Sequence, residues 1–336
     1  MGRYLNPGME SFEKSVNSEI YVDKTGLVGY TNRVMNTVQG YVCVSRPRRF
    51  GKSMAANMLT AYYSRGCDSR EIFSKFEISE SPDFEKYRNK YNTIFLNMQE
   101  FLSRSDSVEA LVDRVKKLVL RDLKREYPDV DYFDDTDLVE SMQDIYETEK
   151  CPFVVIIDEW DCIFREFRQN KEAQEKYLDF LRDLLKDKAC IHLAYMTGIL
   201  PIKKYGTHSA LNMFDEFSMI NPGPLAPYVG FTEVEVEYLC HKYRMDMEEV
   251  KAWYDGYSFS MAASVYSPRS VVNSMLFGKI ENYWNQTETF EALQVYIDMN
   301  FDGLKDDVLS MIAGERIPVN TGSFTNDMTT FRTEDD

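Results

Sequence analysis

The sequence predicts an α/β fold in which a mainly parallel sheet, flanked by helices, is followed by a small helical region. Short strand-like runs at 41–45, 93–98 and 191–198 alternate with segments of helical pattern. Residues 153–157 are five consecutive apolar residues, mostly β-branched, which is typical of a strand buried on both faces. This alternation indicates a parallel sheet with right-handed crossovers, and residues 214–220 supply a fifth candidate strand.

Composition narrows the class of protein. The chain has 336 residues, of which 44% are hydrophobic, enough for one large or two modest domains with a real core. The net charge of −16 argues against bulk electrostatic binding of nucleic acid. No apolar run approaches the ~18 residues that span a membrane, and the polar N-terminus is unlike a signal peptide. The six cysteines lack metal-site spacing, so we expect reduced cysteines and a cytoplasmic protein.

The segment 41–53 carries the strongest functional signal. An apolar strand runs into a loop that ends in Gly51-Lys52-Ser53, and a helix-forming run follows at once. This layout predicts a phosphate-binding P-loop, in which Lys52 reaches the β- and γ-phosphates of a nucleotide and Ser53 holds Mg²⁺. The pattern is unusual because Arg46 stands where the first glycine is expected. The alternative is an ordinary strand–turn–helix with Gly51 in a tight turn.

The candidate nucleotide-binding residues form one continuous stretch of this loop and its helix. Two of them are arginines, which add positive charge beside the phosphates unless they face solvent or an interface. The stretch consists of Arg48, Arg49, Phe50, Gly51, Lys52, Ser53 and Met54.

A second motif follows the apolar run 153–157. Ligands bind outside the carboxyl ends of strands in open α/β sheets, so Asp158 is placed to hold Mg²⁺ and Glu159 to orient and deprotonate water. Thr197 ends the run 191–198; in ATPases with an extra strand between the P-loop strand and the Asp-Glu strand, such a residue senses the γ-phosphate. Lys52, Glu159 and Thr197 are therefore the catalytic candidates. The alternatives are helix caps for the carboxylates and a simple Thr-Gly turn.

The chain divides into four predicted parts. Residues 1–40 are an N-terminal lead-in, and residues 41–228 form a RecA- or AAA-like P-loop NTPase core. Residues 229–300 form a helical lid or accessory domain that opens with a capping signature at 232–235. Residues 301–336 form a polar tail that ends abruptly.

These motifs together resemble the predicted AAA-ATPase-like family of bacteria. The resemblance covers about residues 5–300, and its most specific part is the loop 46–53, in which the missing first glycine is a family trait. Members often carry a C-terminal nuclease-like domain of PD-(D/E)XK type, which is not recognisable here, so we expect a truncated chain. The further matching motifs lie at 21–25, 157–159, 197–199, 230–233, 254–257 and 281–284.

We therefore expect a protein that hydrolyses ATP with Mg²⁺ and couples nucleotide state to a partner or a fused effector domain. The alternatives are a low-turnover nucleotide switch, an accessory module of a nucleic-acid-processing nuclease, and phosphoryl transfer to a small-molecule hydroxyl. ATP is the expected ligand, and a homo-oligomer is possible. Binding of nucleic acid is expected only through a nuclease-like domain, and binding to a membrane is not expected. The sequence does not single out an arginine finger among Arg165, Arg168, Lys203 and Lys204, which all lie near strand ends.

Overall fold

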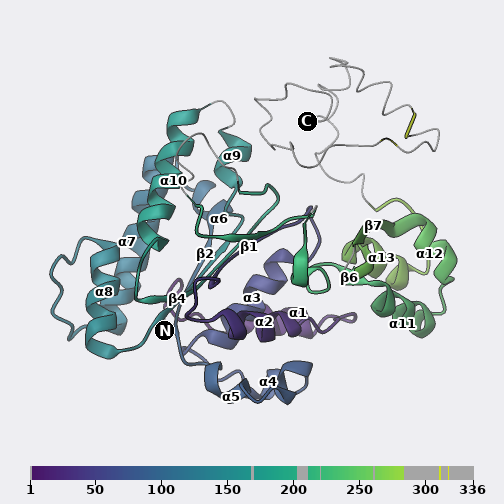
Figure 1. Ribbon diagram of the computed structural model, residues 1–336, viewed down its shortest axis with the longest axis horizontal. Coiled ribbons are helices and arrows are strands. Elements are labelled where there is room, and N and C mark those ends of the chain that lie inside the picture. Colours follow the sequence, from purple (N-terminus) through teal and green to yellow (C-terminus); the bar gives the residue numbers. More distant parts are fainter. Residues whose placement is uncertain are drawn as a thin grey trace.

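A layered core and a smaller accessory region beside it make up the described part of the chain (Figure 1). Residues 284–336, which hold the end of the predicted accessory domain and the predicted tail, lie outside the described part, apart from residues 310, 311 and 317. None of the helices in the described ranges combines the length and the apolar character that a bilayer crossing requires. The computed structural model describes residues 2–167, 170–202, 211–219, 221–259 and 262–283, with residues 310, 311 and 317.

Within these ranges, the core is built on a five-stranded sheet in the order β2-β3-β4-β1-β5. Each neighbouring pair is parallel, as predicted. Because β4 lies between β1 and β3, the extra strand expected between the P-loop strand and the Asp-Glu strand is confirmed. The strands are β1 (Tyr41–Ser45), β2 (Asn92–Asn97), β3 (Phe153–Asp158), β4 (Ile191–Gly198) and β5 (Asp215–Phe217).

The interior strand β3 contributes side chains to two hydrophobic cores, one on each face of the sheet. Side chains alternate across a strand, so Val155 and Ile157 enter one core while Val154 and Ile156 enter the other. All residues of β3 are buried, which confirms the prediction of a strand covered on both faces.

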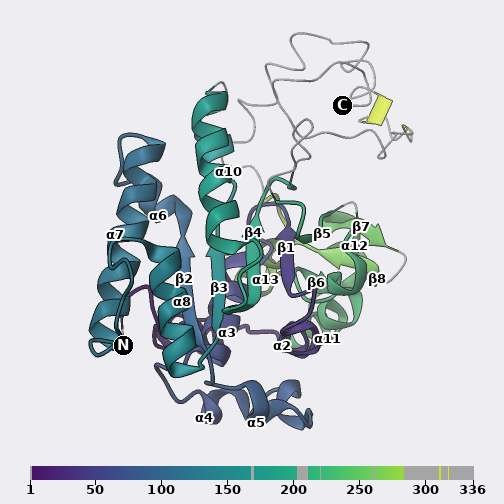
Figure 2. The same ribbon diagram turned by 60° about the vertical axis from the view of Figure 1, so that its left-hand side comes forward.

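Long helices cover one face of the sheet (Figure 2). The largest of them, α7, begins at the N-cap Ser107, whose hydroxyl accepts from the Ala110 N–H at 3.2 Å. Its buried Leu111, Val115 and Val119 recur every four residues and form the stripe that packs on the core. The helices of this face are α6 (Met98–Leu102), α7 (Val108–Glu126), α8 (Leu138–Glu149), α9 (Cys162–Glu166) and α10 (Lys171–Leu185).

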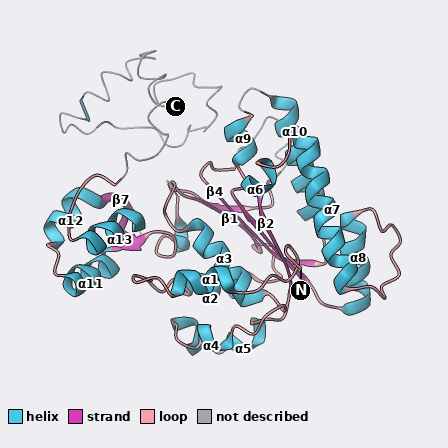
Figure 3. Cartoon of the chain, turned by 180° about the vertical axis from the view of Figure 1, so that it is seen from behind, coloured by secondary structure: helices cyan, strands magenta, loops and turns pink. Residues whose placement is uncertain are grey.

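The opposite face is covered by the lead-in and by the helix that follows the P-loop (Figure 3). The lead-in contributes Phe12 and Leu27 to this second core, where they join Leu59 and Tyr63. The helical parts of the lead-in therefore belong to the core layer, whereas Ile20 packs in the hydrophobic cluster of the accessory region. The elements of this face are α1 (Glu10–Val16), α2 (Gly26–Val34), α3 (Lys52–Tyr63), α4 (Arg70–Phe73), the 3₁₀ turn η1 (Glu77–Glu80) and α5 (Phe84–Tyr87).

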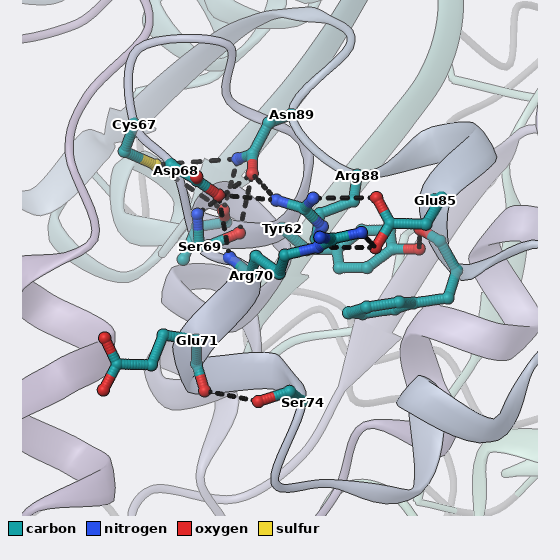
Figure 4. A network of polar contacts seen from close by, with 12 residues as sticks. Tyr62, Cys67, Asp68, Ser69, Arg70, Glu71, Ser74, Glu85, Arg88 and Asn89 are labelled. Carbon is teal, nitrogen blue, oxygen red and sulfur yellow. Dashed lines mark hydrogen bonds and ion pairs between the residues drawn. The ribbon is translucent and has the colours of Figure 1, made fainter.

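A polar network fixes the segment between α3 and β2 (Figure 4). Arg88 donates to Asp68 and to Glu85, both at 2.8 Å, and Arg70 donates to Glu85 at 2.9 Å. Asn89 lies in the left-handed region at φ 54°. Its side chain donates to the carbonyl oxygen of Ser64 at 2.7 Å. The segment is thus held by its own side chains, and we assign it a structural role.

The accessory region differs from the all-helical prediction. It contains a three-stranded antiparallel sheet in the order β6-β8-β7 within the described residues. The capping signature is confirmed as a full capping box between Thr232 and Glu235. The sheet was missed because β6 has two residues and the pairing of β7 with β8 shifts register twice. After the 3₁₀ turn η2 (Gly223–Leu225), the elements are β6 (Phe231–Thr232), α11 (Glu233–Tyr243), α12 (Met247–Tyr254), β7 (Asp255–Phe259), β8 (Ala262–Tyr266) and α13 (Pro268–Phe277).

Candidate nucleotide-binding site

The loop between β1 and α3 turns tightly around the side chain of Lys52. Gly51 caps α3 at φ 90°, in the left-handed region that favours glycine. The side chain of Lys52 bends back over the loop, where Nζ donates to the carbonyl oxygens of Arg46 at 3.0 Å and Pro47 at 2.9 Å. Arg49 is also left-handed, at φ 70°. The loop therefore wraps closely around the lysine ammonium group at the helix N-terminus.

Arg46 explains how the loop forms without its usual first glycine. Its side chain is 1% exposed. The guanidinium donates from Nη1 to the carbonyl oxygens of Ser45 at 2.9 Å and Phe217 at 2.8 Å. Burial lowers the pKa of Arg46 to about 10. The arginine thus lies away from the phosphate side and ties the start of the loop to the edge strand β5.

The carboxyl end of β3 brings Asp158 beside Ser53, as the sequence predicts. Burial raises the pKa of Asp158 to about 6, whereas a hydrogen bond from Ser53 lowers it. Asn97, at the end of β2, donates to Asp158 Oδ2 at 3.4 Å. The following helix α9 has Asp161 as its N-cap residue, so Asp158 and Glu159 are not its caps. Two hard oxygen donors therefore lie together next to the P-loop.

Glu159 occupies a backbone conformation that is rare for its residue type, with φ 55°. Its side chain is 24% exposed and forms an ion pair with Arg165. Burial lowers the pKa of Lys52, while Glu159, Asp161 and Asp158 raise it. Lys52 and these carboxylates therefore belong to one electrostatic cluster.

Thr197 does not join this cluster. Its side chain is fully buried, and its hydroxyl donates to the carbonyl oxygen of Val44 at 3.2 Å. It pairs in register with Asp158 across the sheet. Like Asp158, Thr197 is not among the residues of the described pocket wall, and its role as a sensor of the γ-phosphate stays a prediction.

A pocket of about 1150 Å³ opens above the P-loop. Its wall includes the loop and helix residues Arg48 to Met54, together with Glu159, Tyr21 of the lead-in and Arg269 of the accessory region. Sequence patterns did not indicate Arg269, because it is distant along the chain from every motif of the core. Three parts of the chain therefore meet around one cavity.

Phe50 has a packing role in this wall. The side chain is 1% exposed, and its ring lies edge-to-face on Tyr257 with the ring centroids 5.7 Å apart. Lys24, in the lead-in, makes a second contact with the accessory region. Its ammonium group pairs with Glu235 and donates to the carbonyl oxygen of Pro227 at 2.8 Å. These contacts hold the accessory region against the P-loop.

The charge of the pocket is opposite to that of the chain. Among the described residues, six cationic side chains and three carboxylates line it. The whole chain carries a net charge of −16. The carboxylates are Glu100, Glu159 and Glu166, and the cations are Lys24, Arg48, Arg49, Lys52, Arg165 and Arg269.

Comparison with known proteins gives relatives of limited similarity. A protein from Azotobacter chroococcum mcd 1, named as an uncharacterized protein in the vnfD 5′ region, is 25% identical over 298 residues. The alignment covers 84% of this chain and 54% of that relative, so the chain spans about half of the relative's length. The structure of the Aeropyrum pernix ORC2 protein, with ADPNP and ADP, covers 67% of this chain and 54% of that one at 11% identity and a TM-score of 0.35.

The family assignment rests on a match to a described protein family over more than half of the chain. Residues 6–207 match the family described as Predicted AAA-ATPase. That range contains the P-loop, the parallel strands β1 to β4 and the Asp158-Glu159 pair. The chain therefore belongs to the predicted AAA-ATPase family and has an α/β P-loop NTPase fold.

Proposed function

We propose that this chain binds Mg-ATP in the pocket above the P-loop and hydrolyses it in the cytoplasm. The observation that carries the proposal is the cationic pocket in an acidic chain. A triphosphate is the common cellular ligand whose charge suits such a pocket at a helix N-terminus. The six cysteines lie in the described ranges and form no disulfide, which suits a reducing compartment.

The residues at the loop fit a magnesium ion. A hydroxyl and a carboxylate are the oxygen ligands that Mg²⁺ takes beside a nucleotide, and Ser53 lies close enough to Asp158 to lower the pKa of that carboxyl. The ionised form of Asp158 is disfavoured by burial, so a neighbouring cation stabilises it. When bound, the ion supplies positive charge to the β- and γ-phosphates.

The protein side chains have different roles in the proposed hydrolysis. Lys52 binds the β- and γ-phosphates, and the backbone N–H groups of the loop hold the remaining phosphate oxygens. Glu159 accepts a hydrogen bond from water and aligns it with the γ-phosphorus. A bond forms between the water oxygen and that phosphorus, the bond to the bridging oxygen of ADP breaks, and the proton passes to Glu159. The products are ADP, phosphate and a proton.

The accessory region can pass a change in nucleotide state on to a fused domain or to a partner. Phe231 and Arg269 of that region line the same pocket as the P-loop. We propose that nucleotide occupancy changes how the accessory region packs on the core. This coupling makes the site useful to a fused effector or a binding partner.

The test is nucleotide binding and phosphate release by the purified chain, with and without Mg²⁺. Lys52→Ala should weaken ATP binding by roughly 10- to 150-fold, because a charge-assisted contact contributes about 1.5–3 kcal/mol. Lys176→Ala is the matched control, since Lys176 is 47% exposed in ion pairs on α10. Wild-type affinity in Lys52→Ala would exclude the P-loop as the binding site. Tight binding without turnover in the wild type would favour the switch alternative.

A further inference from the structure

Arg165 lies beside the candidate catalytic groups, although no sequence motif gives it a role there. It lies in the last turn of α9 and lines the pocket together with Lys52. Its side chain is 15% exposed, and Nη2 pairs with Glu159 Oε2. The positive charge of Arg165 is close enough to Lys52 to lower the pKa of that lysine, a smaller effect than those of burial and the nearby carboxylates. Arg165 thus faces the same part of the cavity as the candidate catalytic groups.

A buried carboxylate anchors the other side of this guanidinium. Arg165 Nε lies 3.4 Å from Asp161 Oδ2. Asp161 is fully buried, and its Oδ2 accepts from the N–H groups of Ile199 at 3.0 Å and Leu200 at 2.8 Å. The anchor is therefore fixed by the backbone that follows β4. The Nε edge of the guanidinium thus lies in an ion pair with a fixed carboxylate, while Nη2, which also donates to Gln99 Oε1 at 3.4 Å, is on the side of Glu159.

The other arginines of the pocket differ from Arg165 in exposure or in direction. Arg48 and Arg269 are exposed. Arg49 donates to the carbonyl oxygen of Tyr283 at 3.4 Å, which directs it toward the accessory region. A preorganised group loses less conformational entropy when it engages a ligand. Arg165 is accordingly the best prepared of these four to contact a developing charge.

We propose that Arg165 is an arginine finger supplied by the chain itself, which binds the γ-phosphate of ATP during hydrolysis. The inference rests on the proposed function. The γ-phosphoryl oxygens carry more charge than Glu159 and compete with it for the Nη edge, while Nε stays on Asp161. The exchange has two effects. It stabilises the charge on the phosphoryl group as the bond to ADP breaks, and it frees Glu159 to accept the hydrogen bond from the attacking water.

The experiment compares ATP turnover and nucleotide binding of the wild type with those of Arg165→Ala and Arg165→Lys. We expect kcat to fall by about 10³-fold in Arg165→Ala, the lower end of the range for arginine fingers. Arg165→Lys should also be impaired, because one ammonium group cannot bridge Asp161 and a phosphate as a planar guanidinium does. ADP affinity should stay within about threefold of the wild type, because Lys52 and the loop still hold the phosphates.

A second readout uses ADP with aluminium fluoride, which imitates the phosphoryl group in transfer. Both variants should bind ADP alone but lose the added affinity that aluminium fluoride gives the wild type. Arg182→Ala is the control, since Arg182 forms an exposed 2.8 Å ion pair with Asp179 on α10 and should behave as the wild type. Arg165→Lys keeps a cation beside Asp161, so it still tests the role of the guanidinium if the alanine variant does not fold.

Each outcome has a defined meaning. Variants that hydrolyse ATP within about threefold of an active wild type overturn the inference and leave the proposed function standing. Variants that lose ADP binding as strongly as turnover show that Arg165 shapes the pocket, which also overturns it. A wild type that binds ADP but never hydrolyses ATP removes the proposed hydrolysis and this inference together.

Discussion

Asp158, which is buried, and Glu216, which is half-buried, have carboxyl groups that respond to pH. Burial raises the pKa of both Asp158 and Glu216 to about 6. A raised pKa means that the folded chain binds more protons than the unfolded chain between the ordinary carboxyl value and about pH 6. The contribution of such a group to stability is therefore greatest below that window and falls as pH rises through it.

Glu216→Gln isolates one of these groups. Glu216 lies on β5, and its Oε1 accepts from the N–H of Ile202 at 2.7 Å, a bond that glutamine also accepts. The free energy of unfolding of the wild type should fall between pH 4.5, the ordinary value, and about 6, and it should fall less steeply in the variant. Urea unfolding across this range measures the difference, with the exposed Glu237→Gln as control. Parallel pH curves for Glu216→Gln and the wild type would refute this account.

Single residues could be predicted where their chemistry is local. The P-loop lysine and serine and the pair Asp158-Glu159 follow from short motifs at the ends of strands, and the structure places them together. Thr197 and Arg46 could not be placed in this way, because their partners Val44 and Phe217 lie on other strands. Arg168, Lys203 and Lys204 lie outside the described residues, whereas Arg165 is selected by its contact with Glu159.

Elements were predictable where hydrophobic periodicity is strong. The segments that form β1, β3 and β4 are predominantly apolar, and that of β3 is continuously so over residues 153–157, so the local pattern reveals them. The edge strand β5 is shorter than the predicted run 214–220, because an edge strand pairs on one side over Asp215–Phe217. Residues 1–40 were read as a lead-in, yet α1 and α2 pack on the core, which depends on contacts far along the chain. Long-range packing of this kind leaves little trace in a local pattern.

At the scale of the whole molecule, the accessory region is tied to the core by specific contacts. Gly230 allows one of them, because its φ is 118° and an added Cβ would lie 3.3 Å from Cδ1 of Phe50 in the P-loop. The ion pair between Lys24 and Glu235 adds charge complementarity, with side chains 14% and 24% exposed. Both contacts border the pocket residues, so the packing of this region and the shape of the cavity depend on each other.

A double-mutant cycle measures the Lys24–Glu235 contact. Lys24→Met keeps the apolar stem, and Glu235→Gln keeps the bond from the Thr232 N–H that closes the capping box. We expect a coupling free energy of about 1–2 kcal/mol in unfolding experiments, above that of ordinary surface pairs because both groups are partly buried. The exposed pair Lys176–Glu109 serves as the reference and should couple more weakly. Equal coupling in the two pairs would mean that Lys24 and Glu235 do not hold the accessory region in place.

The most direct test of the central claim is ATP turnover by Glu159→Gln, with ATP binding measured in parallel. Glutamine keeps the shape of Glu159 but loses its charge and its ability to take a proton. The account predicts ATP affinity within about threefold of the wild type and phosphate release lowered by on the order of 10²-fold or more. A variant that releases phosphate as fast as the wild type would contradict the assignment of Glu159, and with it the proposed mechanism of this pocket.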